Sequence, residues 1–382
     1  LPYRDSRDSQ TGISPYTDWN PASYLKQVND SKVAVFHLAG WYDLWPRDAL
    51  VWFNNLKNPQ RIVIGPWSHG QVSAADLASE SLRWYDHWLK GVDNGIMDEP
   101  PILYYTMGAA VGDEWRTSWQ WPLPNEEQTR FYFQKAEAGS IDSVNDGTLS
   151  ASAPAMDDGA FDYTVDYTTT SGRTSRWANG YGGEFGYPDM SANDKKGLTY
   201  TTSPLSADLE ITGHPVVNIW VSSTAKDGDF FAYLEEVDES EFSRYITEGT
   251  LRASDRAVSA PAYNYMGLPF HEGRQGATSG FEAGEPVALV FDMHPTSNVF
   301  NKGHKLRVTI TCADRDNALT PELSPPPTIK IYMDSLHASY ISLPVIPAEV
   351  GEKQKPALLP IVLVVLSLAV MATIVIRIKM RR

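Results

Sequence analysis

The sequence predicts an α/β segment, followed by an all-β sandwich and then a single C-terminal transmembrane helix. Two short apolar runs, residues 33–39 and 61–64, flank a stretch with helical spacing at 48–57. Beyond residue 100 the helical periodicity gives way to short runs, many of alternating apolar and polar residues, separated by turns. Near the end of the chain, residues 357–376 carry no charge, and such a length suits one crossing of a bilayer.

The first segment reads as strand, loop, helix, strand and loop. The first apolar run leads into Gly40-Trp41-Tyr42-Asp43, and the second leads into Gly65-Pro66-Trp67-Ser68-His69-Gly70. The carboxyl ends of parallel strands meet at one edge of a sheet, where open α/β sheets form their sites. We therefore expect Asp43 and His69 at the same edge. Asp followed by His is also the order of the last two members of a Ser-Asp-His triad in α/β-hydrolases.

The rest of the chain is predicted from the same kinds of pattern. Residues 79–90 have the spacing of an amphipathic helix that ends at Gly91. Residues 138–205 are rich in Gly, Ser, Thr, Asp and Asn, so we expect mainly loops there. Examples of the predicted strands of the sandwich are 102–107, 130–133, 216–221, 230–237, 287–291, 306–310 and 329–333. Strands joined by turn-rich connections are typical of an antiparallel sandwich.

Composition excludes several classes of function. The 382 residues, 42% of them hydrophobic and 21% charged, suffice for two folded domains. A net charge of −15 argues against nucleic-acid binding, which needs a basic surface. Cys312 is the single cysteine, and the eight histidines show no metal-binding spacing. We therefore expect no cofactor and no metal.

The charges around the apolar run predict its orientation. Arg377, Lys379, Arg381 and Arg382 follow it, against Lys353 and Lys355 before it. The stronger basic flank favours a cytoplasmic tail at 377–382 and an extracytoplasmic body. Residues 346–356, with two prolines, then form a stalk. The alternative is that 357–376 is a buried core helix.

Both loop motifs belong to a longer series that runs in order across residues 15–345. In this series the chain resembles the cocaine-esterase-like (CocE/NonD) hydrolases of the X-prolyl dipeptidyl-peptidase superfamily. The further motifs are Leu82-Arg-Trp-Tyr-Asp-His-Trp-Leu-Lys-Gly91, Glu99-Pro-Pro-Ile102, Gly213, Asp227-Gly-Asp-Phe-Phe231, Thr247-Glu-Gly-Thr-Leu-Arg252 and Lys302-Gly-His-Lys-Leu-Arg307. The resemblance implies a remnant of a cap at 1–30 and the C-terminal part of an α/β-hydrolase domain at 31–97. It also implies a jelly-roll-like, galactose-binding-like sandwich of the X-Pro dipeptidyl-peptidase C-terminal type at 98–345.

The resemblance implies that Asp43 is the triad acid and His69 the general base. A serine hydroxyl becomes a good nucleophile when a histidine takes its proton, and a carboxylate orients that histidine. No Gly-x-Ser-x-Gly elbow occurs in the 382 residues. We therefore expect the nucleophile to lie outside this chain, which would be inactive alone. The alternative is that Asp43 is an ordinary helix N-terminal residue and that His69 is a loop residue packed against Trp67.

Amino-acid ester hydrolases of this family carry acidic residues two and three positions after the triad acid, and these bind a substrate ammonium. Here those positions are Trp45 and Pro46. The absence of acidic residues at these two positions favours an apolar pocket for the acyl group. We expect Trp41 and Trp45 to line this pocket as substrate-binding residues. The alternative is that both tryptophans serve ordinary packing.

These observations together predict a membrane-anchored serine hydrolase that cleaves ester or amide bonds through an acyl-enzyme. Its partners would be a small ester or amide, or a short peptide, and the membrane through 357–376. One alternative is an X-Pro dipeptidyl-peptidase. Another is a non-catalytic membrane-tethered protein that binds through its sandwich, and a third is a split enzyme completed by a separate N-terminal half.

Overall fold

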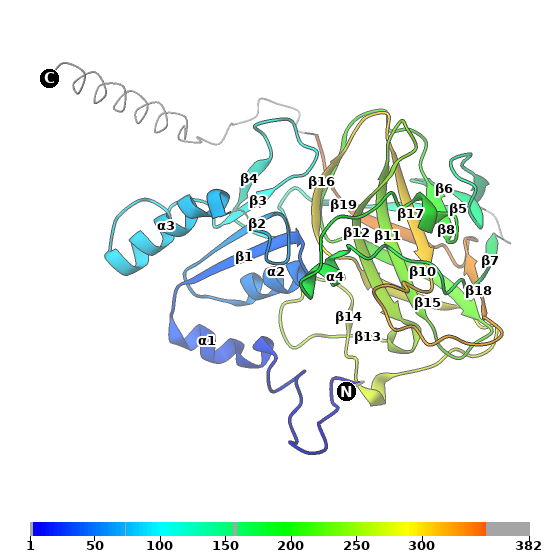
Figure 1. The fold of residues 1–382 in the computed structure, drawn as a ribbon, viewed down its shortest axis with the longest axis horizontal. Coiled ribbons are helices and arrows are strands. Elements are labelled where there is room, and N and C mark those ends of the chain that lie inside the picture. The colour runs from blue at the N-terminus through cyan, green and yellow to red at the C-terminus, as the bar shows by residue number, and fades with distance from the viewer. Residues whose placement is uncertain (1–2, 73, 156–158, 349–382) are drawn as a thin grey trace. The chain divides into compact units, whose positions relative to one another are not determined.

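Two sheets organise the part of the chain that the structure, a computed structural model, describes: residues 3–72, 74–155 and 159–348 (Figure 1). The predicted transmembrane span at 357–376, the tail at 377–382 and most of the stalk lie outside the described residues. Within the described ranges, no helix combines the length and the apolar character needed to cross a membrane.

The first sheet has the order β1-β2-β3-β4, formed by β1 (Val35–Tyr42), β2 (Gln60–Ser68), β3 (Ile102–Tyr105) and β4 (Trp115–Ser118). The first three strands are parallel and β4 is antiparallel to β3. Helix α2 (Pro46–Asn55) connects β1 to β2, so the predicted strand–helix–strand unit is confirmed. The helix begins two residues earlier than its apolar spacing indicates, because Pro46 occupies its first turn, where proline is favoured.

Helix α3 (Ala74–Lys90) also begins earlier than the predicted 79–90 and ends, as expected, before Gly91. A buried arginine of β2 contacts it: Arg61 Nε donates to the Glu80 carboxylate over 2.8 Å. The ion pair joins this helix to the sheet.

The boundary expected at residue 97 does not separate the two sheets. The strand predicted at 102–107 was expected to open the sandwich, but it is β3, which extends the first sheet with Ile102 opposite Ile62 of β2. Both isoleucines are fully buried in the core of that sheet. A four-residue strand carries no sequence signal for its partner, so only packing reveals the sheet to which it belongs.

The second sheet comprises thirteen strands among the described residues and makes up the β-rich portion of the chain, for which the name sandwich is kept. Its main path is β12-β11-β17-β8-β6-β5-β19-β10-β18-β7, with β15 beside β10, and β9 joining β16 to β19. Its core is a large cluster of apolar side chains in which the rings of Phe133 and Tyr200 stack. The strands are β5 (Glu127–Glu137), β6 (Asn145–Ser150), β7 (Ala160–Thr164), β8 (Leu198–Thr201), β9 (Leu209–Gly213), β10 (Val216–Ser223), β11 (Asp229–Val237), β12 (Ser243–Arg252), β15 (Val287–Asp292), β16 (Thr296–Phe300), β17 (Lys305–Thr311), β18 (Thr328–Tyr332) and β19 (Tyr340–Ile346).

Residues 138–205 hold more structure than their composition indicates. β6 and β8 come from this stretch, pair in parallel and fill the sheet between β5 and β17. Polar strand residues are accommodated there because their side chains find buried partners: Asn145 Nδ2 donates to Thr199 O over 3.2 Å. The remaining elements are η1 (Pro21–Tyr24), α1 (Leu25–Ser31), α4 (Arg176–Gly180), α5 (Ser191–Asp194), η2 (Ala253–Asp255), β13 (Val258–Ser259), β14 (Phe270–His271) and η3 (Gln275–Ala277).

A glycine allows β1 and β2 to meet closely just before their loops. The pairing of the two strands shifts register between Gly40 and Tyr42, which marks a bulge. A Cβ atom at Gly40 would lie 2.1 Å from the backbone oxygen of Trp67. The glycine of the first loop motif is therefore required by the approach of two backbones.

Gly40→Ala should lower the free energy of unfolding by about 2 kcal/mol or more, because backbone atoms cannot move away as a side chain can. Gly276→Ala is the matched control, since a Cβ there meets nothing within 4 Å. Urea unfolding of both variants measures the difference. Equal stability of the two variants would contradict the assignment.

Candidate active site

Asp43 and His69 lie at the ends of adjacent parallel strands and contact each other directly. His69 Nδ1 is 2.9 Å from Asp43 Oδ1. The same oxygen accepts a hydrogen bond from the backbone N–H of Leu44 over 2.5 Å. The two side chains are 24% and 43% exposed, for Asp43 and His69 respectively, so the pair is open to solvent on one side. This arrangement leaves His69 Nε2 as the nitrogen available to a nucleophile.

Trp45 lies against the imidazole, whereas Trp41 does not reach it. The Trp45 ring meets His69 edge-on with centroids 5.6 Å apart, and Trp45 is 56% exposed. Trp41 is buried in the core of the first sheet, where its Nε1 donates to Tyr105 O over 2.7 Å. The expectation that Trp41 lines a substrate pocket is wrong, because its indole is enclosed and its N–H already has a partner. The expectation for Trp45 stays a prediction.

Ser68 precedes His69 but is not arranged as a nucleophile. It is buried, and its hydroxyl oxygen has no hydrogen-bond partner among the described residues. A nucleophilic serine has to reach both the histidine and the substrate. The structure gives Ser68 no such access.

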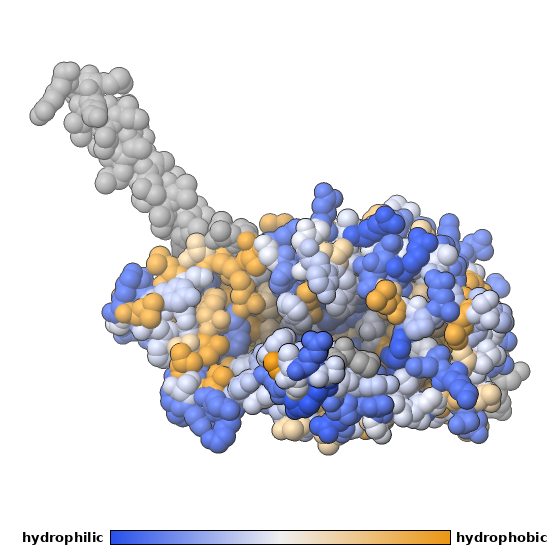
Figure 2. Space-filling view, turned by 60° about the horizontal axis from the view of Figure 1, so that its bottom comes forward, coloured by the Kyte–Doolittle hydropathy of each residue, from blue (hydrophilic) through white to orange (hydrophobic). Residues whose placement is uncertain are grey.

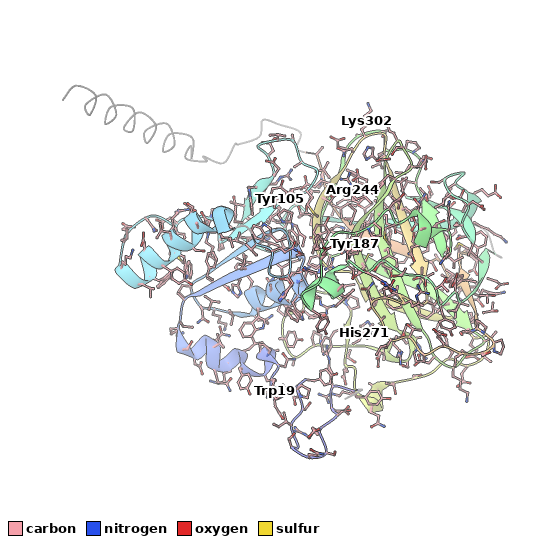
Figure 3. All side chains as sticks on the ribbon, in the orientation of Figure 1. Trp19, Tyr105, Tyr187, Arg244, His271 and Lys302 are labelled. Carbon is pink, nitrogen blue, oxygen red and sulfur yellow. The ribbon has the colours of Figure 1, made fainter. Side chains whose placement is uncertain are left out.

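An aromatic hollow of about 190 Å³ lies beside Tyr42, the residue before Asp43. Figure 3 labels two of its lining residues, Tyr187 and Arg244. The lining residues are Tyr42, Phe185, Tyr187, Pro188, Phe242, Arg244 and Tyr245. A larger cavity, of about 260 Å³, lies in the sandwich around Cys312 and includes neither Asp43 nor His69. Size alone therefore does not locate the candidate site.

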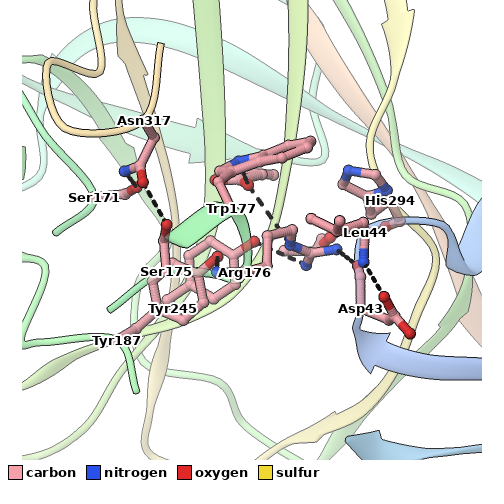
Figure 4. A network of polar contacts seen from close by, with 12 residues as sticks. Asp43, Leu44, Ser171, Ser175, Arg176, Trp177, Tyr187, Tyr245, His294 and Asn317 are labelled. Atoms are coloured by element: carbon pink, nitrogen blue, oxygen red, sulfur yellow. Dashed lines mark hydrogen bonds and ion pairs between the residues drawn. The ribbon is translucent and has the colours of Figure 1, made fainter. Parts of the chain in front are cut away.

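Arg176 of α4 also contacts the Asp43 loop, and no sequence pattern indicated this contact. Its Nη1 donates to the backbone oxygen of Asp43 over 3.0 Å, across 133 residues of chain (Figure 4). The side chain is fully buried, and its Nη2 donates to the Tyr245 hydroxyl over 2.9 Å. An arginine in a glycine-rich stretch of unknown register carries no sequence signal for this contact.

A second cluster of polar side chains, Arg47, Asp292 and His214, lies where α2 packs on the sandwich. Arg47 of α2 pairs with Asp292 of β15 over 3.2 Å. His214 is buried, and neither ring nitrogen has a hydrogen-bond partner among the described residues. Burial, and then the positive charge of Arg47, lower the pKa of His214 to about 3. The imidazole is therefore held in its neutral form.

Comparison with known proteins places these features in a family. Residues 94–342 match the sequence profile of the X-Pro dipeptidyl-peptidase C-terminal non-catalytic domain. Residues 8–71, which include both loop motifs, match the profile of X-Pro dipeptidyl-peptidase (S15 family).

Several relatives are similar over most of this chain. A Mycobacterium bovis protein named provisionally as a serine esterase is 38% identical over 345 residues, which are 86% of this chain and 52% of that protein. The cocaine esterase of Rhodococcus sp. is 27% identical over 78% of this chain and 51% of its own length. A Bacillus anthracis protein named provisionally as an Xaa-Pro dipeptidyl-peptidase is 23% identical over 89% of this chain and 50% of its own length. The chain thus spans about half the length of the curated relatives it matches.

Solved structures share the fold. A CocE/NonD family hydrolase from Staphylococcus aureus superposes with a TM-score of 0.63 at 16% identity, covering 84% of this chain and 55% of that one. An α-amino acid ester hydrolase gives a TM-score of 0.61 at 20% identity, covering 81% of this chain and 55% of that one. Both support a mixed α/β portion followed by a β-rich portion.

The depressed pKa of His214 predicts how stability depends on pH. Between its usual value near 6.5 and its folded value of about 3, the unfolded chain binds a proton that the folded chain does not. The contribution of His214 to the free energy of unfolding is therefore present above pH 6.5 and is lost as the pH falls toward 3. His214→Gln should reduce the loss of unfolding free energy between pH 6.5 and 4.5 by about 2 kcal/mol.

Urea unfolding at several pH values measures this difference. His87→Gln, a partly exposed histidine of α3, is the control and should keep the wild-type pH dependence. A His214→Gln profile that parallels the wild type would show that His214 does not contribute.

Proposed function

The chain belongs to the CocE/NonD X-Pro dipeptidyl-peptidase superfamily, and we propose that it is part of a serine hydrolase that cleaves ester or amide bonds. The observation that carries the proposal is the contact of 2.9 Å between His69 Nδ1 and Asp43 Oδ1 at the carboxyl edge of two parallel strands. Strand ends of such sheets are where open α/β folds form their sites.

In this proposal each residue of the pair has a defined role. The Nδ1–H of His69 donates to the Asp43 carboxylate, which fixes the tautomer and leaves Nε2 to act as the base. Nε2 takes the proton of the attacking serine and then passes it to the leaving group as the acyl-enzyme forms. It next takes a proton from the water that attacks the acyl carbon, and it returns that proton to the serine oxygen as the acyl–serine bond breaks and the acid is released. Asp43 stays ionised and stabilises the imidazolium in both steps.

We place the nucleophile outside these 382 residues, which contain no Gly-x-Ser-x-Gly elbow. The free edge of β1 supports this, because among the described strands β1 pairs with β2 alone. Parallel strands are normally interior strands with both faces covered. Large apolar side chains are instead exposed on this portion, where Figure 2 shows hydrophobic surface at the left. They include Leu38 at 43%, Tyr85 at 54%, Leu82 at 58% and Leu89 at 77% exposure.

The surroundings of the pair favour an ester over a peptide with a free α-amino group. A substrate ammonium needs carboxylates near it, yet the two positions expected to carry them hold Trp45 and Pro46. The exposed indole of Trp45 beside His69 instead offers an apolar surface to an acyl group. X-Pro dipeptidyl-peptidase activity is the second candidate, because the S15 profile covers both loop motifs.

Asp43→Asn, made in the longest native form of the protein, should lower kcat about 10⁴-fold, because an amide stabilises the wrong histidine tautomer. Hydrolysis of p-nitrophenyl acetate and of Ala-Pro-p-nitroanilide measures ester and X-Pro activity separately. Asp48→Asn, on the exposed face of α2, is the control and should keep wild-type rates. Undiminished turnover by Asp43→Asn would refute the triad, and a wild type inert to both substrates and to a fluorophosphonate would favour the binding-protein alternative.

We also propose that residues 357–376 anchor the protein in a membrane, with residues 377–382 on the cytoplasmic side. The proposal rests on twenty uncharged residues followed by four basic ones. The native protein should remain in the membrane pellet after carbonate extraction, and deletion of 357–382 should release it. Release of the undeleted protein by carbonate would contradict the anchor.

A further inference from the structure

Arg176 belongs to the sandwich portion, yet it contacts the loop that carries the proposed triad acid. We propose that Arg176 is a positioning residue, which fixes the peptide after Asp43 so that the Asp43 carboxylate faces His69. The inference rests on the proposed function for its catalytic meaning. Its structural content, a link from the sandwich to the Asp43–His69 contact, can be tested separately.

The link passes through a single peptide unit. The carbonyl oxygen of Asp43 accepts from Arg176 Nη1 over 3.0 Å, and the N–H of Leu44 donates to Asp43 Oδ1 over 2.5 Å. These two groups belong to the same peptide, which is planar with its oxygen and its hydrogen on opposite sides. Holding the oxygen toward Arg176 therefore aims the N–H at the carboxylate. That carboxylate oxygen is the one that contacts His69.

The residues on either side of this peptide are held as well. The N–H of Asp43 donates to the oxygen of Gly40 over 3.0 Å, which closes a tight turn. The side chain of Leu44 packs on the last residue of α4: a Cβ atom at Gly180 would lie 2.5 Å from Leu44 Cδ1. The helix that supplies Arg176 thus also supports the next residue of the loop.

Arg176 is itself anchored by β12. Its Nη2 donates to the Tyr245 hydroxyl over 2.9 Å, and its Nε lies 3.6 Å from the Glu248 carboxylate. Glu248 also accepts from Trp177 Nε1 over 2.7 Å, and the Tyr245 ring stacks on Tyr187 with centroids 3.5 Å apart. Figure 4 shows this network running from the sandwich to the Asp43 loop. A rigid, planar guanidinium can hold these partners at once, whereas a lysine ammonium cannot.

A second buried arginine shows what a purely structural role looks like in this chain. Arg307 of β17 is as buried as Arg176 and pairs with Asp194 over 2.9 Å. Its other hydrogen bonds go to Thr201 and Ser140, also within the sandwich portion. Arg307 therefore matches Arg176 in burial and charge, but its hydrogen bonds within the described residues go to Asp194, Thr201 and Ser140 and not to the Asp43 loop.

The test compares Arg176→Met and Arg176→Lys with Arg307→Met and Arg307→Lys in the longest native form of the protein. The first readout is the NMR signal of the His69 Nδ1 proton, identified by its loss in Asp43→Asn. We expect this signal to weaken and move upfield in both Arg176 variants and to stay in place in both Arg307 variants. We also expect kcat to fall about 10²-fold in the Arg176 variants with KM near the wild-type value, as a misplaced catalytic group would cause.

Thermal melting of all four variants separates positioning from stability. If Arg176→Met does not fold, Tyr245→Phe removes only the hydroxyl that accepts from Arg176, and it must shift the signal in the same direction. A folded Arg176 variant with the wild-type signal and kcat would overturn the proposal, as would equal changes in the Arg307 variants. If the wild type hydrolyses nothing but the signal responds as expected, the proposed function fails and the positioning role stands.

Discussion

The parallel pairing of β1 with β2 is the constraint on which the candidate site depends. It brings the ends of two strands to one edge, and thereby carries Asp43 and His69, 26 residues apart, to within hydrogen-bond distance. Gly40 permits this pairing because a side chain there would collide with the backbone of the second loop. The glycine, the bulge and the contact between the two polar side chains are thus parts of one arrangement.

The sandwich contributes to the same edge through buried charges. Arg47 of α2 reaches Asp292, and Arg176 reaches the Asp43 loop from the opposite direction. Burying an arginine is costly unless its charge is paired, and here Arg47 pairs with Asp292 and Arg176 lies 3.6 Å from the Glu248 carboxylate. These contacts link the sandwich portion to the segment that carries Asp43.

Sequence patterns predicted the elements better than their partners. Alternation and apolar runs located β1, β2 and six of the thirteen described strands of the second sheet, because side-chain periodicity is a local property. The same patterns assigned β3 to the wrong sheet, and they did not locate β6 and β8 within 138–205, where mainly loops were expected. Strand pairing depends on contacts between distant residues, so the residues of a short strand do not show which strand it pairs with.

By itself the sequence determined the strand–helix–strand order around the site and the identity of the pair, Asp43 and His69. Both follow directly from the order of the residues and the spacing of the motifs. Only the tertiary structure decided that Trp41 is core while Trp45 faces the imidazole, because two tryptophans four residues apart are distinguished here by their burial. It also decided that Arg176, 133 residues away, holds the Asp43 peptide. A hydrogen bond across that separation exists only once both sheets have folded and packed together.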